Sequence, residues 1–94
     1  MSNNAFDSLI HAQNRLQICA TLAAVAEIEF KLLRENLNVS DSVLSKHLKS
    51  LEDAGYVVLT KRTDMGRQRT WVSLSDKGLK AYQGHVAALQ AIVG

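Results

Sequence analysis

The sequence predicts a small α+β domain in which helices precede a β-hairpin and one more helix follows it. The chain has 94 residues, 47% of them hydrophobic, which is enough for one core but too short for two domains. Apolar residues recur with helical spacing up to about residue 54, and the spacing changes to alternation between residues 56 and 74. Helical spacing then returns up to about residue 93. We therefore expect one domain over residues 1–94.

The first helix is expected to run from Asp7 to about Ala24. The Asp7 carboxylate can accept hydrogen bonds from the free amides of the first turn. Apolar residues form two stripes at different angles, one through Leu9 and Leu16 and the other through Ile18. A helix that is apolar on two sides has two surfaces to pack against.

Two short helices joined by a turn are expected next, after a brief alternating strand that ends at Phe30. The first of them stops near Asn38 and has no good capping residue, because Glu29 precedes it. The second begins after Ser40, whose hydroxyl can cap it. It ends at Gly55, a residue that readily adopts the left-handed conformation of a helix stop.

A β-hairpin and a final helix complete the predicted order. The strands Tyr56–Arg62 and Thr70–Leu74 are rich in β-branched and aromatic residues, and residues 63–69 are expected to form the turn. The last helix begins after Ser75 and runs to about Val93. The order helix, short strand, helix, turn, helix, hairpin, helix is that of a winged helix–turn–helix.

Several motifs along the chain resemble those of the small MarR/ArsR-like winged-helix transcriptional regulators. The longest is LSKHLKSLEDAGYV over residues 44–57. Shorter ones are Ile10-His11 with Arg15, Arg69-Thr70, and Leu74-Ser75 with Gly78. The resemblance covers about residues 7–90, with two departures, Glu29 at a capping position and a short, polar wing. It implies a helix–turn–helix over about residues 30–55, a wing over about 56–74 and a C-terminal dimerisation helix over about 76–93.

The exposed face of the helix after Ser40 is suited to a DNA groove. Its side chains are small hydroxyls or cations, with no acidic group: Ser42, Ser45, Lys46 and Lys49. Such a thin polar face can enter the major groove, about 12 Å wide, between two lines of phosphates. The resemblance implies that Lys46 and the two serines lie toward the bases and Lys49 toward a phosphate. The alternative is that both lysines only solvate an amphipathic helix.

The hairpin supplies a second cationic group. Arg62, Arg67 and Arg69 flank its tip, where guanidinium groups can follow a phosphate backbone or reach into the minor groove. Thr70 is expected to support them with a backbone contact. Adjacent strand residues point to opposite faces, so at most one of Lys61 and Arg62 is expected to face DNA. The alternative is an ordinary hairpin whose charges suppress edge pairing.

Two apolar stripes are left over for a partner. In the last helix, hydrophobic residues recur at the spacing of a helix–helix seam: Leu79, Tyr82, Val86, Leu89 and Val93. With Leu9 and Leu16 of the first helix, this stripe predicts a homodimer, and the resembled family dimerises in this way. The alternative is that the last helix only covers the core of its own domain.

Other function classes find little support. No apolar run approaches the roughly 20 residues that span a bilayer, and the N-terminus is unlike a signal peptide. The single cysteine, Cys19, cannot form an intrachain disulfide, which fits a reducing cytoplasm. Cys19 and the three histidines lack metal-ligand spacing, and no nucleophile–base pair is readable, so we expect no catalytic residue, metal or cofactor. No pattern marks a site for a small-molecule effector.

The sequence thus predicts sequence-specific binding of double-stranded DNA by a homodimeric transcriptional regulator in the cytoplasm. The competing hypothesis is a winged-helix module that binds protein and not DNA. A continuous positive surface joining Lys46, Lys49, Arg67 and Arg69 would favour DNA. Positive charges scattered among acidic residues would favour protein.

Overall fold

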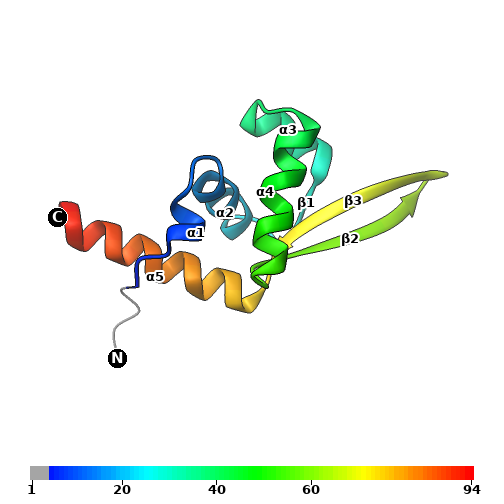
Figure 1. Ribbon diagram of the computed structural model, residues 1–94. Helices are drawn as coiled ribbons and strands as arrows, with labels where there is room; N and C mark the ends of the chain where they lie inside the picture. The colour runs from blue at the N-terminus through cyan, green and yellow to red at the C-terminus, as the bar shows by residue number, and fades with distance from the viewer. Residues whose placement is uncertain (1–4) are drawn as a thin grey trace.

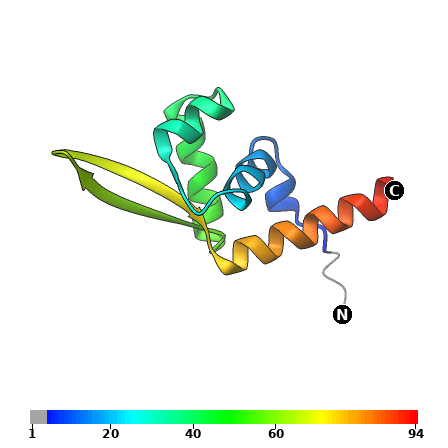
Figure 2. The same ribbon diagram turned by 180° about the vertical axis from the view of Figure 1, so that it is seen from behind.

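The computed structural model describes residues 5–94 as an α+β winged helix, which confirms the predicted fold class (Figure 1). Its elements are α1 (Ser8–His11), α2 (Arg15–Ala23), β1 (Ile28–Glu29), α3 (Phe30–Leu37), α4 (Asp41–Asp53), β2 (Val57–Asp64), β3 (Arg67–Leu74) and α5 (Asp76–Val93). The sheet is antiparallel with strand order β1-β3-β2. The wing, formed by β2 and β3, reaches away from the helices on one side, and the end of α5 reaches out on the other (Figure 2).

The predicted first helix is in fact two helices, α1 and α2. Asp7 caps α1 as predicted, because its Oδ1 accepts a hydrogen bond of 3.1 Å from the Ile10 amide. The chain then leaves the helical conformation, and Asn14 takes a left-handed φ of 71°. This break folds α1 back onto α2. Ile10 and Ile18 are therefore both fully buried in the core, although they lie on different helices.

The helix–turn–helix follows the predicted pattern. After α3 the chain turns at Asn38, which has a φ of 55°. Its amide donates hydrogen bonds to the Arg34 and Glu35 carbonyls in the last turn of α3. Ser40 then caps α4 by accepting from the Val43 amide at 3.2 Å. Gly55, with a φ of 80°, follows the end of α4. As predicted, Glu29 makes no side-chain cap for α3.

The prediction of a seven-residue turn at the tip of the wing is wrong. The two strands pair without interruption up to Asp64 opposite Arg67, so only Met65 and Gly66 form the turn. Both have positive φ, 50° and 78°, as a tight two-residue hairpin turn requires. Arg67 and Arg69, which were expected in the turn, both lie on the regular strand β3.

The core lies between the helices and the inner face of the sheet. Its fully or almost fully buried members come from every helix up to α4 and from both wing strands: Ile10, Ile18, Cys19, Leu22, Leu33, Leu44, Leu48, Leu51, Val57 and Val72. α5 adds a narrow buried face through Gly78, Gly84, His85 and Ala88. None of the helices within residues 5–94 has both the length and the apolar character needed to cross a bilayer.

Candidate nucleic-acid interface

α4 presents the predicted polar face to solvent. Its inner side is fixed by Leu44, Leu48 and Leu51, which are buried in the core. The opposite side exposes all four predicted contact residues, Ser42, Ser45, Lys46 and Lys49. Rigid packing on one side and small or cationic groups on the other leave a face that can enter a groove.

The two lysines of this face differ in their surroundings. Among residues 5–94, Lys46 has no ion-pair partner. Lys49 donates to Asp53 one turn away at 3.1 Å, and this hydrogen bond raises the pKa of Lys49. The Lys49–Asp53 pair is exposed, and exposed pairs of this kind contribute little to stability. Lys49 can therefore exchange Asp53 for another anion at little cost.

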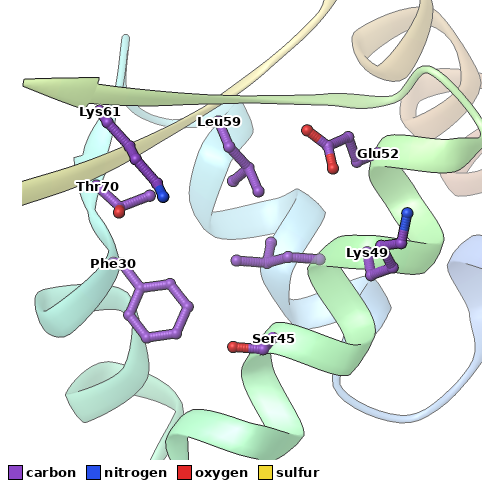
Figure 3. Close-up of a pocket in the computed structure, with 8 residues that line it drawn as sticks. Phe30, Ser45, Lys49, Glu52, Leu59, Lys61 and Thr70 are labelled. Atoms are coloured by element: carbon purple, nitrogen blue, oxygen red, sulfur yellow. The ribbon is translucent and has the colours of Figure 1, made fainter.

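A groove of about 330 Å³ separates α4 from the wing (Figure 3). Ser45 and Lys49 line it from α4, and Lys61 and Thr70 line it from the wing strands. The structure thus brings together three predicted contact residues, Ser45, Lys49 and Thr70. Lys61, which the sequence analysis left out of its contact set, joins them. Its position follows from strand alternation, because Leu59 packs toward the core and Lys61, two residues later, lies on the same face.

The wing arginines lie on the opposite face of the hairpin. Arg62 and Arg69 are directly paired across the strands, so their side chains share that face. Arg62 forms an ion pair with Glu27. Its guanidinium carbon lies over the Trp71 ring, 4.6 Å from the ring centre. Arg69 pairs with Glu29 at 3.1 Å. The predicted contact residues of the wing therefore lie on two faces, with Thr70 facing the groove beside α4 and the arginines on the other side.

The predicted test of surface charge gives a mixed result. Cations exceed carboxylates in the wing, whereas α4 carries two lysines and three carboxylates, Asp41, Glu52 and Asp53. Glu27 and Glu29 add carboxylates beside the wing. Arg67, like Lys46, has no ion-pair partner within residues 5–94. Positive charges are thus interleaved with acidic side chains on α4 and beside the wing.

Arg15 connects α2 to the back of α4. Its side chain makes two hydrogen bonds within the protein. Nε donates to His47 Nδ1 at 3.3 Å, and Nη1 donates to the Leu9 carbonyl at 3.3 Å. Burial lowers the pKa of His47, and the charges of Arg15 and Lys46 lower it further. His47 is therefore a neutral hydrogen-bond acceptor at the edge of α4.

A second polar cluster joins the N-terminal segment to α5. The Asp7 amide donates to His85 Nδ1 at 2.9 Å, and His85 Nε2 lies 3.1 Å from His11 Nδ1. Because His85 Nδ1 accepts, the proton of the neutral ring is on Nε2, which donates to His11. The Tyr56 hydroxyl donates to Asp7 at 2.6 Å, and this bond raises the pKa of Tyr56 to about 12. Desolvation raises the pKa of buried Cys19 to about 11, so this thiol stays protonated.

The described residues hold no group of three or more histidine, cysteine or acidic side chains placed to bind a metal ion. The predicted contact residues lie on α4 and on the wing. A helix–turn–helix followed by a hairpin beside the second helix is the architecture of winged-helix DNA-binding domains.

The chain belongs to the winged-helix DNA-binding domain family, whose family model matches residues 14–93. This is a family of DNA-binding transcriptional regulators and not of enzymes. An uncharacterised protein of Methanocaldococcus jannaschii is 36% identical over 72 residues, which are 77% of this chain and 78% of that protein.

Solved structures show the same fold. A transcriptional regulator homologue from Pyrococcus horikoshii OT3 superposes with a TM-score of 0.85 at 25% identity, over 90% of this chain and 84% of that one. Reduced AbfR, solved bound to DNA, superposes with a TM-score of 0.74 at 22% identity, over 84% of this chain and 56% of AbfR. These similarities confirm the resemblance to MarR/ArsR-like regulators.

Proposed function

We propose that the protein is a homodimeric, cytoplasmic transcriptional regulator that reads a specific sequence in double-stranded DNA. The observation that carries the proposal is the α4 face, where Ser42, Ser45 and Lys46 are exposed on a helix held rigidly by its buried leucines. Hydroxyl and ammonium groups on a rigid helix can make hydrogen bonds to base edges in the major groove. AbfR, a structural relative, has been solved with DNA bound, which supports the same use of this fold.

The remaining contacts position the protein on the duplex. Donors for phosphates or the minor groove come from Lys49, Arg62, Arg67, Arg69 and Thr70. Lys61 adds a further cation beside α4. Contacts of this kind increase affinity without reading sequence directly. Specificity is therefore assigned to Ser42, Ser45 and Lys46 of α4, and general affinity to Lys49 and the wing.

The homodimer is inferred from the apolar residues that the protein leaves uncovered. On α5, Leu79 is 36% exposed and Val93 is 84% exposed, while Val86 and Leu89 are half-buried. Leu9, Leu16 and Tyr82 are also half-buried, but they pack against the core of their own domain. The C-terminal half of α5 is therefore the main contact with a second copy, and the first helices contribute at its margin.

Selection of bound duplexes from a random-sequence pool tests DNA recognition and symmetry together. A two-fold dimer is expected to select a pseudo-palindrome with half-site centres about 10 bp apart, or a multiple of that spacing. Sedimentation at micromolar concentration is expected to show a dimer. Single, unpaired half-sites together with a monomer would refute the dimer.

The same experiment decides between DNA and protein as the ligand. If no duplex is enriched and none is retarded in a gel at low salt, the DNA-binding proposal is wrong. The protein-interaction module is then the better hypothesis. Enrichment of one sequence family excludes that alternative as the main activity.

A further inference from the structure

The arginines of the wing are occupied by carboxylates from the segment around β1. Glu29 lies opposite Trp71 in the sheet register, and Trp71 shares its face of β3 with Arg69. Glu29 therefore projects on the face that carries the wing arginines, and its carboxylate meets Arg69. Like charges directly opposite each other destabilise a sheet, and Arg62 and Arg69 are such a pair. The carboxylate of Glu29 relieves this repulsion in the free protein.

The bond between Arg69 and Glu29 leaves part of the guanidinium unused. A single nitrogen, Nη1, donates to both carboxylate oxygens of Glu29, at 3.1 Å and 3.3 Å. Nε is buried without a hydrogen-bond partner, and a carboxylate oxygen of Asp64 lies 4.0 Å from it. The strongest arginine–carboxylate pairs use two nitrogens in parallel. The Arg69–Glu29 pair does not reach that geometry.

The surroundings of this pair are those of an anion site. A surface pocket of about 340 Å³ is lined by Lys31, Arg67 and Arg69, together with Glu29 and Gln68. Among the residues that line the pocket, three cations thus face one carboxylate, and Asp64, opposite Arg67 in the wing, adds a second carboxylate 4.0 Å from Arg69. The pocket also lies at the start of α3, the first helix of the helix–turn–helix, and in this motif the first helix crosses the DNA backbone. A phosphate in this pocket would meet the same three cations.

We propose that Glu29 is an internal counter-anion of the wing, and that a backbone phosphate of DNA replaces its carboxylate on Arg69. The inference rests on the proposed DNA-binding function and adds a regulatory element to it. Because the phosphate only replaces the carboxylate of Glu29, Arg69 contributes less to the affinity for DNA than an arginine without an ion-pair partner would. Glu29 thereby keeps binding to random DNA low. Removing its charge is expected to tighten binding through Arg69 specifically.

A double-mutant cycle on duplex DNA tests this proposal. The variants are Glu29→Gln, Arg69→Ala, the double variant, and Glu35→Gln as a control with the same change of charge. Glu35 is exposed and lies outside this pocket, and its Oε2 is 3.9 Å from Nη2 of Arg34. Glutamine preserves the shape of Glu29, which makes no side-chain cap on α3, so the variant is expected to fold, and thermal unfolding verifies this.

The dissociation constant is measured by fluorescence anisotropy with a labelled random-sequence duplex at several salt concentrations. Glu29→Gln is expected to bind at least about threefold more tightly at low salt, with the gain shrinking as salt increases. The gain is expected to vanish in the Arg69→Ala background, and Glu35→Gln is expected to change affinity by less than about 1.5-fold.

Three results would overturn the inference. The first is a wild-type protein that binds DNA with the same affinity as Glu29→Gln. The second is a gain that persists without Arg69, and the third is an equal gain in Glu35→Gln. Both of the latter mean that only the net charge matters. A wild-type protein that binds no duplex refutes the proposed function itself, which separates the two failures.

Discussion

Replacing Gly78 with alanine is expected to disrupt the junction between the wing and α5. A Cβ atom at this position would lie 2.0 Å from the carbonyl oxygen of Tyr56 and 2.8 Å from its carbonyl carbon. That carbonyl is part of the backbone leading into the wing, and it accepts a hydrogen bond of 2.9 Å from the Ser75 amide. Neither side of the contact can move without separating the start of α5 from the start of β2.

Two opposing effects determine the magnitude. Alanine is favoured over glycine inside a helix by about 1 kcal/mol. Overpacking costs about 1–3 kcal/mol and occasionally more, and here the contact is a full ångström inside the 3.0 Å below which real Cβ contacts essentially never occur. Because the obstacle is backbone, we expect the upper part of this range or beyond. The net loss is then about 2–3 kcal/mol in the free energy of unfolding, or about 10–20 °C in Tm.

Thermal and urea unfolding followed by circular dichroism measure this change. Gln83→Ala, an exposed substitution on the same helix, is the control and is expected to change the free energy of unfolding by less than about 0.5 kcal/mol. A Gly78→Ala protein as stable as the wild type, or more stable, would show that helix propensity outweighs the contact. The reasoning about the junction would then be wrong.

Two further predictions concern DNA readout and pH. Lys46→Ala is expected to cost about 1–3 kcal/mol at a selected site and to flatten the preference at one or two bases, whereas Arg67→Ala should weaken all duplexes alike and reduce the salt slope by about one. Equal losses on specific and random DNA in both variants would contradict the assignment of α4 as the reading helix. Burial, and after it the charge of His11, lowers the pKa of His85 below its usual 6.5. The unfolded chain therefore binds more protons than the folded protein near this pH. The free energy of unfolding should consequently fall as the pH drops below about 6.5. His85→Asn, which keeps an acceptor for the Asp7 amide, should reduce this fall in urea unfolding between pH 5 and 8; an unchanged pH dependence would mean that other groups cause it.

The sequence by itself determined the order of elements after the first predicted helix, together with the bounds and exposed face of α4. Ser40 and Gly55 mark the ends of α4 by local capping chemistry, which depends only on neighbouring residues. The buried face of α4 follows from the spacing of its leucines. Its exposed face was therefore predictable before any tertiary contact was known.

Only the tertiary structure decided how the charges of the wing are used. The break at Asn14 and the tight turn at Met65 depend on which surfaces the chain must bury and pair, and local patterns do not specify these. The contact between Glu29 and Arg69 joins residues 40 positions apart, brought together because β1 pairs with β3. Strand pairing is a long-range interaction, and its register determines which charges meet, so the partner of each arginine could not be predicted from composition or spacing.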